Sequence, residues 1–148
     1  MSSEPAQRAG RIGLLARARP ESLARLMADF EPGPARRWLR PPEIGLVMTR
    51  GRAGATGDAF NLGETTATRC ALRLDTGETG FACVLGRDKA HAERAALADA
   101  LLQTEAGAAV ARDVLEPLAE EEAARRAAQA RRAAATKVEF FTMTRGEG

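Results

Sequence analysis

The sequence predicts an α+β domain with N-terminal helices, a small and mostly antiparallel sheet, C-terminal helices and an extended tail. Three observations indicate this class. Apolar residues recur at helical spacing near the N-terminus, short strand-like runs with turn signals occupy the middle, and alanine-rich blocks fill much of the last third. With 148 residues the chain has the usual size of one domain. We therefore expect a single domain over residues 1–148.

The N-terminal segment 8–30 predicts two helices. Leu14 and Leu15 lie on the first, and Pro20 opens the second, where its missing N–H costs nothing. The second helix carries one apolar face at positions i, i+3, i+4 and i+7, formed by Leu23, Leu26, Met27 and Phe30.

The middle of the chain predicts strands. Pro41 and Pro42 exclude a helix there. Three runs at 44–49, 67–74 and 79–85 have strand character, and the DTGE sequence at 75–78 joins the last two as a hairpin turn. The glycine-rich segment 50–64 is expected to form no regular element.

The last third predicts helices. Residues 88–103 form one, with Asp88 as its N-cap, and residues 111–136 form another, with Pro117 in a first turn. The ending VEFFTM at 138–143 is aromatic and β-prone, so we expect it to be extended. The helix after Pro117 carries no large apolar residue beyond Leu118, so it is either a solvated helix stabilised by ion pairs or a small-residue face that approaches another chain closely. On the second interpretation, residues 117–148 form a helical arm and tail that packs on a partner.

The core should be small for the length of the chain. Leu, Ile, Val and Phe together make 27 residues, whereas alanine, which buries little surface, makes 32. A chain of this kind often completes its core against another subunit. We expect the isolated chain to be poorly soluble or partly disordered.

The charge balance argues against a nucleic-acid partner. The 22 basic and 20 acidic residues nearly cancel, whereas nucleic-acid binding would predict a large excess or a dense basic stripe. No segment fits a membrane span, and the first residues lack the apolar core of a signal peptide. Together with only two cysteines, these features favour a cytoplasmic location with reduced thiols.

Cys70 and Cys83 are expected to face each other across the hairpin. If its loop has two or four residues, paired positions sum to 153, and both thiols lie on one face near Leu72 and Leu85. A three-residue loop with a bulge would instead place the cysteines on opposite faces.

A glycine-rich loop is the first candidate site. Gly51, Gly54 and Gly57 recur at every third position beside Arg50 and Arg52. Such a loop is typical of a connection between strands, of a segment ordered by a partner, or of backbone that approaches phosphate. No GK[ST] sequence follows, so it is not a P-loop. Its candidate interface residues are Arg50, Arg52, Gly54 and Gly57.

The LGRDK turn at 85–89 is the second candidate site. A strand ends, Gly86 turns the chain, and a helix begins at Asp88, flanked by Arg87 and Lys89. Helix N-termini attract anions, although Asp88 itself would compete for the free N–H groups. The alternatives are therefore a plain capped turn and an anion or interface site made of Gly86, Arg87, Asp88, Lys89, His91 and Arg94. Arg94 lies on the apolar face of its helix, where it either extends to solvent or pairs with an acid.

Metal and cofactor chemistry are not predicted. His91 and Glu93 form an H-x-E motif, but the P-C-x-x-C that zinc deaminases need does not follow. Cys70, Cys83 and His91 lack the spacing of a zinc site. No nucleophile and base stand out, so we assign no catalytic residue, no metal and no cofactor.

Several strings occur in a specific order along the chain. They include LLARARPESLARL at 14–26, the run from Pro41 to Asp88, VLGRDKAHAERAALADALL at 84–102 and VEFFTMTRG at 138–146. Together these strings resemble the PhnG family, the G subunits of the carbon–phosphorus lyase core complex. The resemblance covers nearly the whole chain at collinear positions, and the order and spacing of the strings carry it.

The resemblance implies a function inside an assembly. It implies a cytoplasmic complex of G, H, I and J subunits, in which this chain contacts the I subunit most directly. It further implies that the G, H and I subunits, with the L protein, replace the adenine of ATP by an alkylphosphonate, giving a ribose 1-alkylphosphonate 5-triphosphate. We expect an accessory subunit whose tail residues Phe140 and Phe141 belong to an interface. The alternatives are a stand-alone phosphate-ester or nucleotide transferase that uses LGRDK, and a generic adaptor.

Overall fold

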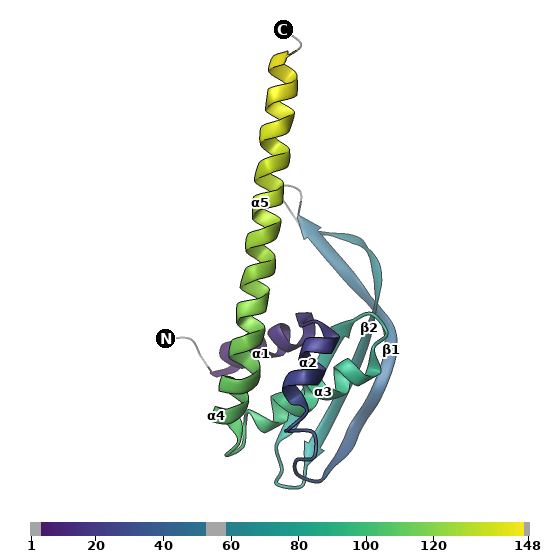
Figure 1. Ribbon diagram of the computed structural model, residues 1–148. Coiled ribbons are helices and arrows are strands. Elements are labelled where there is room, and N and C mark those ends of the chain that lie inside the picture. Colours follow the sequence, from purple (N-terminus) through teal and green to yellow (C-terminus); the bar gives the residue numbers. More distant parts are fainter. Residues whose placement is uncertain (1–3, 53–58, 147–148) are drawn as a thin grey trace.

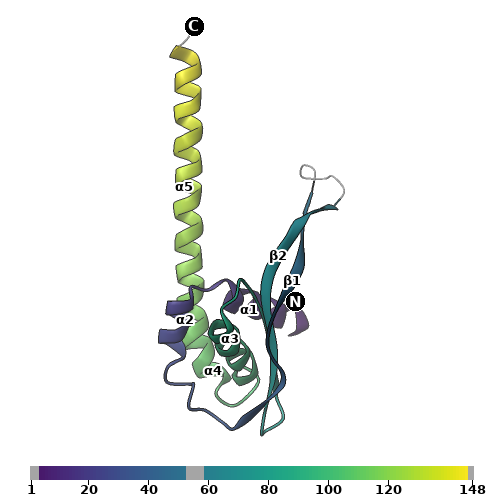
Figure 2. The same cartoon turned by 90° about the vertical axis from the view of Figure 1, so that its right-hand side faces the viewer.

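The computed structural model describes residues 4–52 and 59–146 of the chain. Helices cover one face of a three-stranded antiparallel sheet, and a long C-terminal helix leaves this body (Figures 1 and 2). The predicted α+β class, with helices at both ends of the chain, is confirmed.

The N-terminal helices are α1, Glu4–Arg17, and α2, Pro20–Met27. Both were predicted, and Pro20 occupies the first turn of α2, where its missing N–H disrupts no helical bond. Leu15 of α1 and Leu23 and Met27 of α2 are fully buried. These helices therefore pack their apolar faces into the common core.

The sheet contains β1, Arg36–Arg52, β2, Ala59–Leu74, and β3, Thr79–Leu85, in that spatial order. The strand at 44–49 was predicted too short, because β1 runs on through Pro41 and Pro42. Its register with β2 shifts between Arg40 and Glu43, on either side of the prolines. Since β1 is an edge strand, prolines without an N–H are tolerated there.

The expectation of an irregular segment at 50–64 was wrong on both flanks. Arg50 pairs with Asn61 and Arg52 pairs with Ala59, so β1 and β2 form a long hairpin arm. The register shifts between Thr49 and Arg50, next to Gly63, whose φ of 141° is a conformation that glycine adopts readily. Cross-strand pairing thus outweighs the weak strand preference of glycine here.

The turn between β2 and β3 sets a register that differs from the prediction. The Leu74 N–H donates to the Glu78 carbonyl at 2.9 Å, and Gly77 adopts φ 109°, so the loop has three residues. Cys70 consequently pairs with Ala82, and Cys83 pairs with Arg69. The predicted Cys70–Cys83 pairing was wrong. The two free cysteines lie on opposite faces of the sheet, and Leu85 is 67% exposed on the outer face.

Helix α3, Lys89–Leu101, lies on the inner face of the sheet and supplies much of the core. Asp88 is its N-cap, as predicted, and accepts a hydrogen bond from the His91 N–H at 3.0 Å. Alanines let α3 approach the sheet closely: a Cβ added to Gly80 of β3 would lie 1.9 Å from the carbonyl oxygen of Ala96. The alanine-rich core is thin but tightly packed.

The C-terminal helices are α4, Gly107–Val110, a π-helical turn η1, Ala111–Leu115, and α5, Glu116–Gly146. The Glu116 N–H reaches back to the Ala111 carbonyl, which widens the helix just before Pro117, a residue that has no N–H and needs room. The expected extended tail at 138–143 was wrong, because these residues continue α5. Once a helix is nucleated, extending it is far easier than starting one, and the alanine-rich run before the tail supports this.

Candidate functional site

The LGRDK turn presents its charged residues to solvent. Gly86 has φ 97°, which lets the chain leave β3 and enter α3 directly. Arg87, Asp88 and Lys89 are exposed. Because the Asp88 carboxylate already accepts the His91 N–H, part of the anion-binding capacity of this helix N-terminus is occupied.

His91 lies apart from these exposed charges. It is only 3% exposed, and its Nε2 lies 2.9 Å from the carbonyl oxygen of Leu15 in α1. We assign the ring proton to Nε2, because a carbonyl oxygen can only accept. His91 therefore joins α3 to α1 inside the core.

Arg94 pairs with an acid of its own chain. Its Nε donates to a carboxylate oxygen of Glu31, which follows α2, and both side chains are partly exposed. The second of the two expectations for Arg94 is thus confirmed. A small cavity of about 130 Å³ lies beside this pair.

The other candidate residues lie elsewhere in the molecule. Arg50 and Arg52 belong to the far end of β1, and Gly54 and Gly57 lie outside the described residues. Phe140 and Phe141 belong to the distal part of α5. Figure 1 places the end of β1 and the distal part of α5 away from the start of α3, so these candidates do not form one site.

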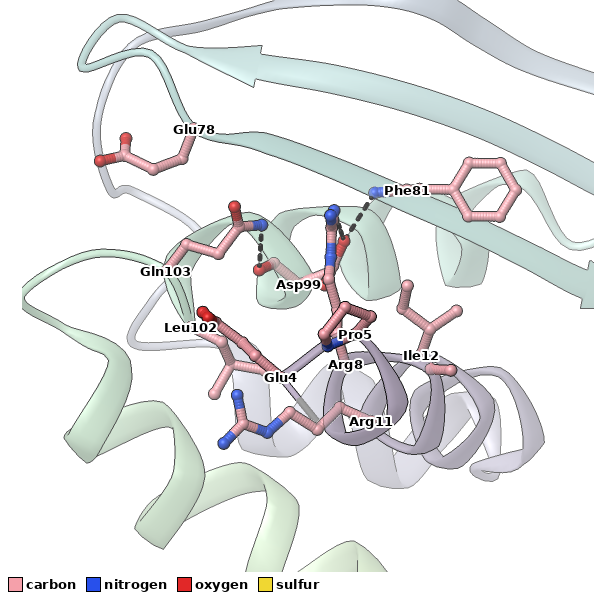
Figure 3. A pocket seen from close by; sticks show the side chains of 11 residues that line it. Glu4, Pro5, Arg8, Arg11, Ile12, Glu78, Phe81, Asp99, Leu102 and Gln103 are labelled. Atoms are coloured by element: carbon pink, nitrogen blue, oxygen red, sulfur yellow. Dashed lines mark hydrogen bonds and ion pairs between the residues drawn. The ribbon is translucent and has the colours of Figure 1, made fainter. Parts of the chain in front are cut away.

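A cavity of about 810 Å³ lies between α1, β3 and α3. At its base the Asp99 carboxylate, 1% exposed, accepts two hydrogen bonds from Arg8, at 2.9 and 3.2 Å (Figure 3). It also accepts the Phe81 N–H at 2.9 Å. Hydrogen bonding to Asp99 raises the pKa of Arg8, and the two side chains act as a charged unit.

The hydrogen bonds around Asp99 occupy backbone groups at one end of β3, an edge strand of the sheet. Arg8 and Gln103 both donate to the Thr79 carbonyl, at 2.9 and 2.8 Å, while Asp99 takes the Phe81 N–H. Polar groups that an edge strand would offer to another strand are therefore already satisfied. Sequence reasoning missed Asp99, although an acid among the buried alanines and leucines of α3 is a signal for a paired carboxylate.

The β1–β2 hairpin extends beyond the helical layer (Figure 2), and apolar side chains of β1 are exposed. Ile44, Leu46 and Met48 are 40%, 63% and 52% exposed. Ile44 pairs with Thr68, which is buried, so these three alternate residues continue the side of the sheet that faces the core. We call them the arm face. Their alternation resembles a half-buried strand, yet among the described residues no helix covers them fully.

Ion pairs hold the first turns of α5 against the N-terminal helices. Glu122 accepts from Arg17 of α1 at 2.9 Å, and Glu121 accepts from Arg25 of α2 at 3.4 Å. The hydrogen bond from Arg17 lowers the pKa of Glu122. Beyond this root, α5 projects from the body in both views (Figures 1 and 2).

Among the side chains of residues 4–48 and 63–137, no three of His, Cys, Asp or Glu gather in a way that would hold a metal ion. In the same part of the chain, no helix combines the length and the apolar character needed to cross a membrane.

Comparisons with known proteins agree with one another. The family model described as "Phosphonate metabolism protein PhnG" matches residues 6–146. A relative from Rhizobium meliloti (strain 1021), named alpha-D-ribose 1-methylphosphonate 5-triphosphate synthase subunit PhnG, is 47% identical over 146 residues. That alignment covers 96% of this chain and 91% of the relative.

Proposed function

The chain belongs to the PhnG family of phosphonate metabolism proteins, and we propose that it is an accessory subunit of a ribose 1-alkylphosphonate 5-triphosphate synthase. In this proposal it works in the cytoplasm within a carbon–phosphorus lyase core complex, together with H, I and J subunits. With the L protein, the complex replaces the adenine of ATP by an alkylphosphonate. The name of the R. meliloti relative, a synthase subunit, supports this assignment.

The arm face is the observation that carries the proposal. Its Ile44, Leu46 and Met48 lie on the core-facing side of the sheet but beyond the helices that would cover them. Exposed apolar side chains that are contiguous mark a surface made for another protein. Burying a fully exposed side chain of this kind contributes about 1.5–3 kcal/mol, and covering the exposed part of each residue here contributes a share of that. We propose that the I subunit covers this face.

An accessory role is supported by how the reactive side chains are used. The single histidine of the chain bonds a backbone carbonyl, and Asp99 is committed to Arg8 and Phe81. The Cys70 thiol contacts the carbonyl of Ala92, and burial raises its pKa to about 11. These groups hold the fold together and are poorly suited to act as a base or nucleophile at neutral pH.

Further surfaces extend the proposed interface. Residues 117–148 form an arm that packs on a partner, with Phe140 and Phe141 in the contact. Arg50 and Arg52, at the end of the strand that carries the arm face, belong to the proposed contact. Gly54 and Gly57, which lie outside the described residues, are included in it on the sequence alone. Arg87 and Lys89 of the LGRDK turn are exposed and available for a similar contact.

Co-purification tests the arm face. In a complex expressed with a tagged I subunit, Leu46→Glu should lower the recovered amount of this chain at least about tenfold, since a free energy of about 1.4 kcal/mol corresponds to that factor. Thr65→Glu is the matched control, because Thr65 pairs with Val47 and lies on the opposite side of the same hairpin. Full recovery of the Leu46→Glu chain would refute the proposed contact.

A further inference from the structure

The exposed part of α5 has no support from its own domain. Leu118 is buried, but every side chain from Gln129 to Lys137 is exposed. Helices in water draw most of their stability from packing an apolar face, and this stretch packs none. A helix that projects in this way needs a partner surface to hold it.

The charges of α5 are segregated over residues 116–137. Glu120, Glu121 and Glu122 lie at its root, whereas no acid occurs from residue 123 to residue 137. That stretch, which we call the basic segment, contains Arg125, Arg126, Arg131, Arg132 and Lys137. The near-neutral balance of the whole chain conceals this local charge of +5.

Acids within residues 4–48 and 63–137 do not neutralise the outer cations. Glu122 pairs with Arg17 and with Arg126, and Glu121 pairs with Arg25. Among the side chains of residues 4–48 and 63–137, Arg131, Arg132 and Lys137 have no ion-pair partner. Their charge is thus directed outward, over a helix length of about 18 Å from residue 125 to residue 137.

From these charges we infer that the basic segment of α5 docks on an acidic surface of a partner subunit. The inference rests on the proposed function, and it adds the chemistry of the partner surface. Arginine suits such a contact because its guanidinium group binds carboxylates in a bidentate manner. The residues between the cations are mainly alanine, so the partner can approach the helix closely.

Two other partners fit the segment less well. A membrane-surface helix needs an apolar face opposite its charges, and residues 123–137 contain no large apolar side chain. Nucleic acid would also attract the cations. However, the chain carries a net charge of only +2, and three glutamates lie directly at the root of the same helix.

Zero-length cross-linking with a carbodiimide tests the inference in the intact complex. This reagent joins an amine to a carboxylate with which it is in direct contact, and the chain has only two lysines, Lys89 and Lys137. We expect a cross-link between Lys137 and an Asp or Glu of a partner subunit. Lys137→Arg should abolish that product while the complex still assembles, because the charge is retained. A Lys137 that yields no cross-link to a partner subunit would overturn the inference.

Charge reversal provides the second readout. Arg131→Glu with Arg132→Glu should weaken recovery of the complex at least about tenfold at low salt, because two attractions become repulsions. Lysine at both positions should restore recovery. Arg11→Glu with Arg19→Glu is the control of equal charge change at exposed sites outside α5, and it should leave recovery unchanged.

The outcomes separate the inference from the proposed function. If the unmodified chain recovers no partner subunit, the proposed function fails. If the chain recovers its partners and both reversal variants behave alike, only the acidic docking surface is refuted. If nuclease treatment removes the difference between the variants, the basic segment binds nucleic acid and the inference is overturned.

Discussion

The buried carboxylate of Asp99 in α3 and the guanidinium group of Arg8 in α1 form two hydrogen bonds, at 2.9 and 3.2 Å. Asp99 is 1% exposed, whereas the Arg8 side chain is 42% exposed. The same carboxylate accepts the Phe81 N–H of β3. One side chain therefore joins the N-terminal helix, the central helix and the edge strand.

Arg8→Ala should destabilise the fold more than an equivalent change at the surface. The variant leaves Asp99 Oδ2 with the Phe81 N–H but leaves the buried Oδ1 without a donor. The free energy of unfolding should therefore fall by about 1–3 kcal/mol, the cost of a buried acceptor left unpaired. Arg17→Ala removes the more exposed ion pair between Arg17 and Glu122, and it should lower the free energy of unfolding by less than about 1 kcal/mol. Urea unfolding of the two variants checks this order, and equal losses would contradict it.

Gly80→Ala should be among the most damaging single-methyl changes in the sheet. The added Cβ would lie 1.9 Å from the Ala96 carbonyl oxygen, so α3 must move away from β3. We expect the free energy of unfolding to fall by about 3 kcal/mol or more, which is at the upper end of the costs of overpacking. Gly45→Ala is the control, because its Cβ would meet no atom within 4 Å. Thermal unfolding measures both, and a Gly80→Ala variant as stable as the control would refute the close approach.

Local signals predicted most of this fold. The proline at the start of α2, the Asp88 cap and the strand at 79–85 were each visible in the sequence. The register of the hairpin between β2 and β3 could not be predicted, because the choice between two-, three- and four-residue loops depends on Gly77 adopting a positive φ. The tail was misjudged because β-prone residues such as Phe140 and Phe141 follow a long alanine-rich helix that simply continues.

The two cysteines should differ sharply in reactivity. Cys70 is fully buried, and burial raises its pKa to about 11, so little reactive thiolate forms near about pH 8. Cys83 lies on the other face and is partly exposed. Iodoacetamide should label only the Cys83 thiol quickly in the native protein, and both thiols after denaturation. A Cys83→Ser variant should label slowly, whereas fast labelling of that variant would show that Cys70 is accessible.

Lowering the pH should weaken the ion pair that holds the first turns of α5 against α1. Arg17 lowers the pKa of Glu122 from its ordinary 4.5, so this pair stabilises the folded chain above pH 4.5. The stabilisation is lost as the pH falls below that value and the carboxylate becomes protonated. Glu122→Gln should therefore cost up to about 1 kcal/mol at neutral pH and nothing in strong acid. Urea unfolding across this range measures the difference, and a cost that does not change with pH would contradict the assignment.

The candidate sites were less predictable than the fold. The LGRDK turn was located correctly, but His91 was grouped with it because sequence proximity does not reveal that a helix turns one side chain toward Leu15. Asp99 was overlooked since its partners, Arg8 and Phe81, are distant in sequence. The arm face depends on where the helical layer ends, which no local pattern records.

The central claim is that this chain is a necessary but accessory subunit of the synthase. The most direct test measures adenine released from ATP and methylphosphonate by the H and I subunits and the L protein, with and without this chain, and by this chain alone. We predict release only when all components are present, and none from the chain alone. Adenine release by the isolated chain, or an unchanged rate when the chain is omitted, would contradict the account.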